Sequence, residues 1–302
     1  MQIAITGPTG AIGLDLVNQC LDRGDKVIAL VNPNSKRLNK LPKTDDLKIV
    51  KCNITDYKKI ESEYKCDIFY HLAWVNTFGP ARDDVFSQSN NIQYALDAVN
   101  LASSWGAKSF VGVGSQAEYG IANVPLNKDT PVNPESGYGI AKYAAGKLCE
   151  LLCHQKKMKF NWARILSVYG PNDAEHTLIM YLIRSLQNNT IPELTECEQI
   201  WDYIYSKDCA KALLSIGHNG VDGRVYCIGS GERKTLKEYV KTLRDVVAPN
   251  NKLGFGMKSY YPHQPMFLTA DISDLINDTN YSPNYSFEEG IKEIIKELNR
   301  SR

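Results

Sequence analysis

A short apolar strand runs directly into a glycine-rich segment at the start of the chain, and this junction constrains the fold more than any other feature. Residues 6–13 read Thr-Gly-Pro-Thr-Gly-Ala-Ile-Gly, and a helical pattern follows. Gly7 permits a tight turn, Gly10 lets the backbone approach a pyrophosphate, and Gly13 lets helix and strand pack closely. Free N–H groups at the helix start favour an anion. The segment therefore predicts a loop that binds a nicotinamide dinucleotide. Further contacts to that cofactor are expected from Thr9, Ala11 and Ile12.

Beyond this loop, short β-rich runs alternate with helical patterns. The runs are apolar and β-branched without regular alternation, as is typical of parallel strands that are covered on both faces. Strands are predicted at Ile3–Thr6, Lys26–Val31, Leu47–Cys52, Ile68–Ala73, Ser109–Ser115 and Phe160–Val168. Helices are predicted at Ala11–Arg23, Asp56–Glu63, Ser87–Trp105 and Tyr138–Gln155. This order predicts an α/β fold of the Rossmann type, which is a doubly wound parallel sheet.

The pattern changes after Gly170-Pro171. The next predicted elements are a helix at Thr177–Asn188, a strand at Gln199–Tyr205, a helix at Lys207–Gly217 and a strand at Arg224–Ile228. Two final helices follow capping boxes that begin at Thr235 and Ser286. We therefore expect a dinucleotide-binding domain over residues 1–171 and a smaller C-terminal substrate-binding lobe over residues 172–302, with parts of 200–235 threaded back onto the first domain.

The end of the second predicted strand bears on the choice of cofactor. NAD-binding units usually place a carboxylate there, about 20 residues after the loop, to bind the ribose 2′-hydroxyl. This chain reads Val31-Asn32-Pro33-Asn34-Ser35-Lys36-Arg37, with no carboxylate. Arginine can hold a 2′-phosphate through its planar fork. Contacts from Asn32, Ser35 and Arg37 are therefore expected, and NADP(H) is favoured over NAD(H). The alternative is a solvated basic turn.

The composition limits the classes of partner. A formal net charge of +1 gives no electrostatic case for nucleic acid or an anionic membrane, and no apolar run approaches the roughly 20 residues that span a bilayer. The chain begins Met-Gln without a signal sequence, so we expect a cytoplasmic protein whose eight cysteines are thiols. Cys149, Cys153 and His154 lie close together on a predicted helix. No second cluster completes a zinc site, so no metal is expected.

Three residues form a candidate catalytic group. Tyr138 and Lys142 are four residues apart, so on a helix they share one face. A tyrosine hydroxyl has an ordinary pKa of about 10, and a neighbouring ammonium lowers that pKa toward the working range of a general acid. Ser115 is predicted at the carboxyl end of a parallel strand, where open α/β sheets bind ligands. Its hydroxyl would hold a substrate carbonyl oxygen.

Several motifs in this order resemble the extended short-chain dehydrogenase/reductase superfamily, in particular its nucleotide-sugar epimerase, dehydratase and reductase branch. They are the glycine loop, Asn53-Ile54 before Asp56, Tyr70-His71-Leu72-Ala73, Gly114-Ser115, Tyr119-Gly120, Tyr138-Gly-Ile-Ala-Lys142, Arg164 leading to Val168-Tyr169-Gly170-Pro171, Trp201-Asp202-Tyr203-Ile204 and Asp208. The resemblance covers nearly the whole chain. It implies catalysis by Ser115, Tyr138 and Lys142, of which the last two also touch the cofactor. It further implies cofactor contacts from Asn53, Ile54, Leu72, Ala73, Ile165 and Val168, and substrate contacts from Trp74, Gln116, Ser167 and Trp201.

Departures from the family pattern narrow the reaction. The dehydratase subgroup follows its catalytic hydroxyl with an Asp-Glu pair, whereas this chain has Gln116 and Ala117, and alanine cannot transfer a proton. Glu118 is one residue further on and is expected to point elsewhere. Ser167 and Trp201 stand where many relatives have an asparagine and an arginine that contact the sugar diphosphate. A tryptophan there is similar to ketoreductase-like members and can stack on a base or sugar.

These features favour an NADPH-dependent reductase of a nucleotide-linked 4-keto sugar, in particular a 4-keto-6-deoxyhexose. The alternative is a nucleotide-sugar 4-epimerase that retains NAD and uses the same three residues twice. A noncatalytic dinucleotide-sensing module is a third hypothesis. A nucleotide-diphosphate sugar is thus the expected small-molecule partner.

The resemblance also suggests a homodimer that pairs the helices predicted at 87–105 and 138–155 across a two-fold axis. Their apolar positions at helical spacing are Ile92, Ala95, Leu96, Val99, Ile140, Ala144, Leu148 and Leu152. Burial of these side chains within one subunit is the alternative.

Overall fold

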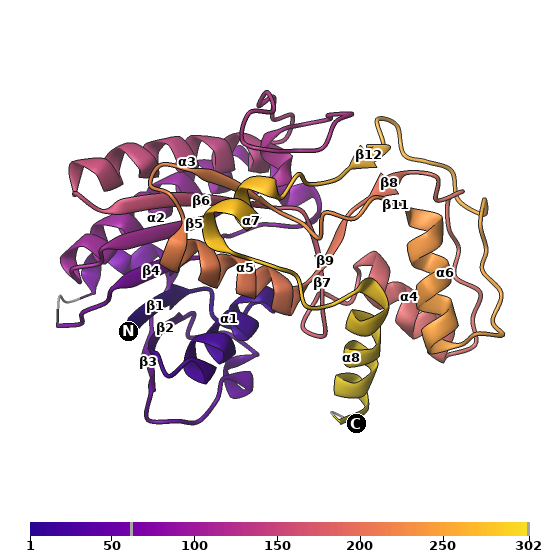
Figure 1. The fold of residues 1–302 in the computed structure, drawn as a ribbon, viewed down its shortest axis with the longest axis horizontal. Helices are drawn as coiled ribbons and strands as arrows, with labels where there is room; N and C mark the ends of the chain where they lie inside the picture. The colour runs from indigo at the N-terminus through magenta and orange to yellow at the C-terminus, as the bar shows by residue number, and fades with distance from the viewer. Residues whose placement is uncertain (61–62, 301–302) are drawn as a thin grey trace.

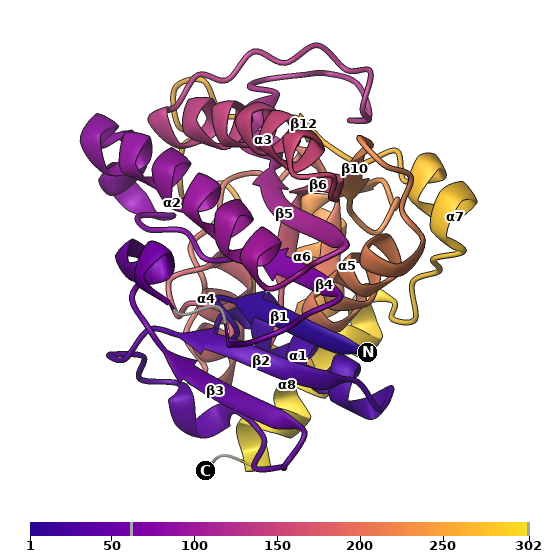
Figure 2. The same ribbon diagram turned by 90° about the vertical axis from the view of Figure 1, so that its left-hand side faces the viewer.

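A seven-stranded parallel sheet forms the larger part of the molecule (Figures 1 and 2), in a computed structural model that describes residues 1–60 and 63–300. The strand order is β10-β6-β5-β4-β1-β2-β3, and every neighbouring pair is parallel. The strands are β1 (Gln2–Thr6), β2 (Lys26–Val31), β3 (Leu47–Lys51), β4 (Ile68–His71), β5 (Ser109–Ser115), β6 (Lys159–Ile165) and β10 (Val225–Ile228). The chain reverses its direction of winding between β1 and β4. The predicted doubly wound Rossmann fold is therefore confirmed.

Two helices cover each face of this sheet. Helices α2 (Val85–Ser104) and α3 (Gly137–Gln155) pack together on one face, and α1 (Ala11–Asp22) and α5 (Ser206–Asn219) pack on the other (Figure 2). Strand β1 is almost wholly apolar because both of its faces are buried, and Ile3, Ala4 and Ile5 have no exposed surface. The result is one apolar core on each side of the sheet.

Two predicted strands are each divided by a tertiary contact. The predicted strand at 160–168 is β6 followed by β7 (Ser167–Tyr169), because the backbone changes partner after Leu166, the N–H of which still donates to Ile228 of β10. The predicted strand at 199–205 is β8 (Ile200–Trp201) and β9 (Tyr203–Tyr205). Between them the buried Asp202 carboxylate accepts from the N–H groups of Ser230, Gly231 and Ala270 at 2.7, 3.1 and 3.2 Å. Strands β7 and β9 pair with each other instead.

The helix predicted at Asp56–Glu63 was wrong in type and extent. A 3₁₀ helix, η2, spans Ile54–Lys59 instead. The end of the predicted helix falls on residues 61 and 62, which lie outside the described part of the chain.

Most of the remaining elements form a smaller body beside the sheet (Figure 1). They are α4 (Leu178–Gln187), β11 (Lys234–Thr235), α6 (Leu236–Val247), β12 (Phe267–Leu268) and α8 (Phe287–Arg300). Helix α7 (Ser273–Thr279) instead packs on α5 and β10 of the larger part. Both predicted capping boxes are present: the Thr235 and Ser286 hydroxyls accept from the N–H groups of Glu238 and Glu289 at 3.2 and 3.3 Å. Helices α4, α6 and α8 share an apolar cluster with Tyr169. The two-domain boundary at residue 171 stays a prediction. Strand β10, which lies within residues 200–235, belongs to the main sheet.

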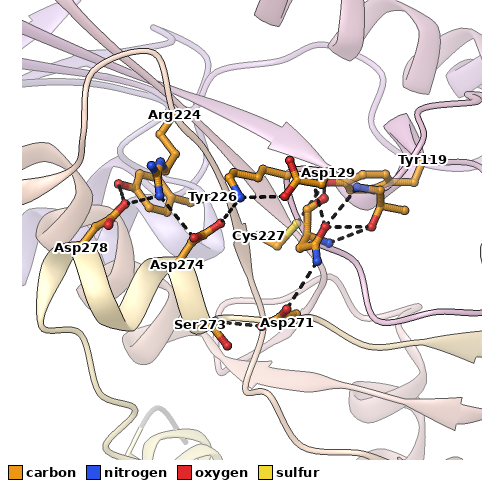
Figure 3. A network of polar contacts seen from close by, with 12 residues as sticks. Tyr119, Asp129, Arg224, Tyr226, Cys227, Asp271, Ser273, Asp274 and Asp278 are labelled. Atoms are coloured by element: carbon orange, nitrogen blue, oxygen red, sulfur yellow. Dashed lines mark hydrogen bonds and ion pairs between the residues drawn. The ribbon is translucent and has the colours of Figure 1, made fainter.

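A polar network holds α7 and the segment after Tyr119 against edge strand β10 (Figure 3). The Arg224 guanidinium pairs with Asp274 at 3.2 Å and with Asp278 at 3.0 Å. On the inner side of the network, the Tyr119 hydroxyl lies 3.1 Å from Cys227 Sγ. These contacts attach the C-terminal part of the chain to the sheet. No helix in the described ranges is long and apolar enough to cross a membrane.

Candidate active site

Two adjoining cavities lie at the carboxyl ends of the central strands. The first, of about 380 Å³, is lined by the glycine loop and by residues 72–74 after β4. The second, of about 470 Å³, is lined by Ser115 at the end of β5, by Tyr138 at the start of α3 and by residues 165–170. Ala11, Ile12 and Val113 line both cavities. This is the edge where doubly wound sheets bind ligands, at the point where the winding reverses.

The glycine loop has the geometry of a phosphate cradle. Gly7 has a φ of +67°, which favours glycine because a side chain there would be strained. Gly10 is the N-cap of α1, and no side chain caps this helix end, so its first N–H groups face the cavity side uncapped. A side chain at Gly13 would collide with the Gly7 carbonyl and with Pro8. The close packing expected at Gly13 is therefore against the loop itself rather than against the strand. The residues present fit a dinucleotide pyrophosphate.

The predicted cofactor contacts fall into three groups. Gly7, Gly10, Ala11, Ile12, Gly13, Arg37, Leu72 and Ala73 line the first cavity, and Ile165 and Val168 line the second. Thr9 and Ser35 lie behind the first cavity, where the Ser35 hydroxyl donates to Thr9 Oγ1 at 2.9 Å and ties the end of β2 to the loop. Asn32, Asn53 and Ile54 line neither cavity.

The basic turn after β2 reaches across the first cavity. Arg37 donates to the Asn172 carbonyl at 2.7 Å, and Lys40 donates to Asn172 Oδ1 at 2.6 Å. Both cations therefore hold the 170–177 segment, which carries Asp173 into both cavities. The contact of Arg37 with a 2′-phosphate stays a prediction. In its present position Arg37 has a backbone partner that a phosphate would have to replace.

The two predicted catalytic residues lie in one cavity. Ser115 and Tyr138 both line the second cavity, and the Ser115 side chain acts on the Tyr138 hydroxyl and lowers its pKa. Ser115 Oγ also accepts from the Ala117 N–H at 3.2 Å, which fixes its direction. Burial raises the pKa of Tyr138 overall, although the Ser115 side chain and the charge of Arg82 lower it. The lowering expected from the Lys142 ammonium was therefore wrong, because burial outweighs the charges near the ring. A carbonyl oxygen in this cavity would meet a hydrogen-bond donor and a proton source side by side.

Lys142 lies beneath this pair rather than at the cavity surface. Its Nζ donates to the Val113 carbonyl at 2.6 Å and lies 3.7 Å from the centre of the Trp74 ring. The same atom is 5.8 Å from the centre of the Tyr138 ring. Burial lowers the pKa of Lys142 to about 7, against the charge of Glu118, which raises it. The predicted triad is therefore assembled, with its ammonium turned toward Trp74.

Glu118 points away from the cavity, as expected, and its carboxylate binds the backbone at the end of β5. Its side chain is fully buried. Oε1 accepts from the Ser115 N–H at 2.8 Å and from Trp162 Nε1 at 3.0 Å, and Oε2 accepts from Arg164 Nε at 2.7 Å. With Ser115 as N-cap this forms a capping box, whose Ser-x-x-Glu spacing is visible in the sequence. That spacing is a sequence signal for a structural role of Glu118.

The predicted substrate residues are distributed over three places. Gln116 and Ser167 line the second cavity. Trp74 lies between Lys142 and Tyr138, with its ring edge-on to that of Tyr138 at 6.2 Å. Trp201 does not line the second cavity; its Nε1 donates to Ser167 Oγ at 2.9 Å from behind. The indole of Trp201 therefore orients Ser167, and its stacking on a substrate stays a prediction.

Two charged residues of the second cavity were not predicted. Arg82 comes from the 3₁₀ helix η3 (Gly79–Asp83), and Asp173 from the segment after β7. Burial raises the pKa of Asp173, against hydrogen bonds from Ala174 and Thr177. Asp173 follows Gly170-Pro171 closely, which is a weak positional signal. Arg82 lies in a stretch without periodicity, so nothing local in the sequence indicates its role.

The cysteine and histidine residues do not form a metal centre in the structure's described ranges. Cys149 and Cys153 are both buried in the core between α3 and the sheet. Burial raises the pKa of the Cys149 thiol to about 12, so this group stays protonated at neutral pH.

Comparison with known proteins gives a consistent result. The NAD dependent epimerase/dehydratase family matches residues 3–229. An uncharacterized UDP-glucose epimerase of Bacillus subtilis, YtcB, is 25% identical over 96% of each chain. The dTDP-6-deoxy-L-talose 4-dehydrogenase (NAD(+)) of Aggregatibacter actinomycetemcomitans is 24% identical over 80% of this chain and 88% of that protein.

Solved structures share the fold over the whole chain. The UDP-glucuronic acid 4-epimerase of Bacillus cereus, solved with NAD, superposes with a TM-score of 0.84 at 21% identity and covers 99% of each chain. The protein RMD of Pseudomonas aeruginosa, complexed with NADPH, superposes with a TM-score of 0.82 at 18% identity and covers 100% of each chain.

Proposed function

We propose that this chain, which belongs to the NAD-dependent epimerase/dehydratase family and is an enzyme of the extended short-chain dehydrogenase/reductase type, reduces the 4-ketone of a nucleotide-linked sugar. The substrate would be a 4-keto-6-deoxyhexose. The observation that carries this proposal is that Ser115 and Tyr138 line one cavity, which adjoins the cavity of the glycine loop. In the proposed reaction these two side chains bind and protonate a carbonyl oxygen beside a bound dinucleotide.

Each residue has a distinct task in this reaction. The glycine loop holds the pyrophosphate of the dinucleotide, and the bound cofactor supplies the hydride. Ser115 donates a hydrogen bond to the substrate oxygen and so stabilises the negative charge that develops there. Tyr138 gives its proton to the same oxygen. Lys142, beneath the Trp74 ring, supplies positive charge under the reacting groups.

The residues after Ser115 favour reduction over elimination. Water elimination needs an acid and a base beside the sugar, and Gln116 and Ala117 provide neither. Glu118 is committed to Ser115, Trp162 and Arg164. The 4-dehydrogenase relative, named for a 6-deoxy sugar, supports chemistry at the same carbon.

A nucleotide-sugar 4-epimerase is the second candidate, and it is favoured by the Bacillus subtilis and Bacillus cereus relatives, both of which are named as epimerases. The same hydroxyl pair would remove and then return a proton at one oxygen. The two functions differ in cofactor turnover, because an epimerase regenerates its own dinucleotide while a reductase consumes one NAD(P)H for each product.

We propose NADPH as the preferred reductant. The end of β2 has no carboxylate to bind a ribose 2′-hydroxyl. Arg37 lines the same cavity as the glycine loop, where it can bind a 2′-phosphate. Solved structures of the same fold hold NAD in one case and NADPH in another, so the fold is compatible with both.

A panel assay separates these functions. The purified protein is mixed with UDP-, dTDP-, CDP- and GDP-linked 4-keto-6-deoxyhexoses and NADPH, and the loss of reduced nicotinamide absorbance is followed. In parallel, UDP-glucose and UDP-glucuronate are incubated without added reductant, and epimers are separated by chromatography. Tyr138→Phe is the matched control in both arms. Epimer formation without any NADPH loss over the panel would overturn the reductase proposal.

A further inference from the structure

Arg82 is an unpaired cation in the second cavity. Its guanidinium carbon lies 4.8 Å from the centre of the Tyr138 ring, and its side chain lines the same cavity as the Tyr138 and Ser115 hydroxyls. The ion pairs found over residues 1–60 and 63–300 include none from Arg82. Its Nε is buried without a hydrogen-bond partner. A guanidinium stays charged throughout the pH range of proteins, so it favours a negative charge arising beside it.

The position of Arg82 is fixed by contacts on both sides of η3. The Asp83 carboxylate accepts from the Gly137 N–H at 2.8 Å, which ties η3 to the residue that precedes Tyr138. The preceding turn is tied to α2, because Gln88 Nε2 donates to the Asn76 carbonyl at 2.9 Å. The cation is therefore held against the amino end of α3, and its place over the ring does not depend on a bound ligand.

Lys142 is less well placed for the same electrostatic task. Its Nζ is 5.8 Å from the centre of the Tyr138 ring, is hydrogen-bonded to the Val113 carbonyl and lies against Trp74. Burial lowers the pKa of Lys142 to about 7, so part of the population is uncharged at neutral pH. Arg82 is the cation at Tyr138 that keeps its full charge.

The charged and titratable groups around Tyr138 come from five segments. They are Ser115 of β5, Glu118 of the 3₁₀ helix η4 (Gln116–Glu118), Lys142 of α3, Arg82 of η3 and Asp173 of the segment after β7. Burial and the Glu118 charge raise the pKa of Tyr138, and Ser115 and Arg82 lower it. Arg82 is thus the charged group in this set that acts against burial.

We propose that Arg82 is a positioning residue for Tyr138, which supplies the fixed positive charge that stabilises the tyrosinate formed when Tyr138 gives up its proton. The proposal rests on the ketone reduction proposed above. In that step the carbonyl carbon receives a hydride from the reduced dinucleotide, and the carbonyl oxygen takes the proton of Tyr138. The electron pair of the broken O–H bond remains on the phenol oxygen, on the ring over which the Arg82 guanidinium lies, until a proton from solvent restores the hydroxyl.

The test is a titration of Tyr138 in the ligand-free protein. The protein is labelled with [¹³Cζ]tyrosine, and the Tyr138 signal among the 17 tyrosines is identified by its loss in Tyr138→Phe. The signal is followed from about pH 8 to about pH 12, because burial raises the pKa of Tyr138 above the ordinary tyrosine value. Arg82→Gln should move the Tyr138 titration upward by about one pH unit or more, because it removes an opposite charge near the ring. Arg82→Lys should restore part of that shift.

Arg23→Gln is the matched control, since Arg23 lies at the end of α1, at the opposite edge of the sheet, and pairs with Asp25 at 3.4 Å. It should leave the Tyr138 signal unchanged. The other tyrosine signals report whether each variant is folded. An equal titration in Arg82→Gln and the parent overturns the proposal.

An activity arm separates this inference from the proposed function. If a substrate from the panel is turned over, the pH profile of its reverse oxidation should move in the same direction in Arg82→Gln, with kcat more affected than KM. If no panel substrate reacts, the titration result still decides the role of Arg82, because it needs neither substrate nor cofactor.

Discussion

Removal of the Glu118 carboxylate should destabilise the protein far more than removal of an exposed one. The Glu118–Arg164 pair is separated by 2.7 Å, and its side chains are 1% and 5% exposed. Glu118→Ala leaves the Arg164 guanidinium buried without its partner, which typically costs about 3–5 kcal/mol. It also leaves the Ser115 N–H and Trp162 Nε1 without an acceptor. We expect a loss of about 4 kcal/mol or more, a large share of the roughly 5–15 kcal/mol that stabilises a typical protein.

The chain provides its own control for this prediction. Glu175 and Arg184 are paired at 2.8 Å, but their side chains are 85% and 46% exposed. Glu175→Ala should therefore cost less than about 1 kcal/mol, as exposed ion pairs do. Urea denaturation of both variants, followed by circular dichroism, gives the difference. Addition of Arg164→Ala to Glu118→Ala should recover part of the loss, because it removes the uncompensated charge. Equal costs for Glu118→Ala and Glu175→Ala would refute the reasoning.

Three further predictions concern catalysis, cofactor choice and assembly. Tyr138→Phe should lower turnover by about 10²–10⁴-fold with unchanged dinucleotide affinity in a fluorescence titration, and Ser115→Ala should lower it less; full activity of Tyr138→Phe would show the mechanism to be wrong. Arg37→Ala should weaken NADPH binding by about tenfold, the loss of one charge-assisted contact, and leave NADH binding nearly unchanged, whereas equal affinity of the parent for both dinucleotides would contradict the NADPH preference. Leu148 and Leu151 on α3 are 43% and 60% exposed, and Leu148→Glu with Leu151→Glu should convert a homodimer to monomers in light scattering; a monomeric parent at micromolar concentration would count against the dimer.

Local pattern predicted the main sheet well because each strand is a self-contained apolar run. The predicted strands Lys26–Val31 and Ser109–Ser115 coincide with β2 and β5. Errors arose where an apolar run continues but the backbone changes partner. Asp202 lies within such a run, and nothing in its neighbours indicates that four donors from distant segments meet its carboxylate. Hydrophobic periodicity indicates which side chains are buried, but it does not indicate which strand the backbone pairs with.

The site shows the same division between local and distant information. Tyr138 and Lys142 could be predicted because a helix brings residues four apart onto one face. That spacing suggests that Lys142 alone tunes Tyr138. The fold instead places the Lys142 ammonium against Trp74 and Val113 and brings the Arg82 guanidinium over the tyrosine ring from a separate segment. The positive charge that the motif assigns to Lys142 alone thus comes from two residues. Lys142 contacts Val113 and Trp74, and Arg82 lines the cavity in which the tyrosinate would form. Because the two come from different elements, substitution of Lys142 should leave the upward shift of the Tyr138 titration in Arg82→Gln in place.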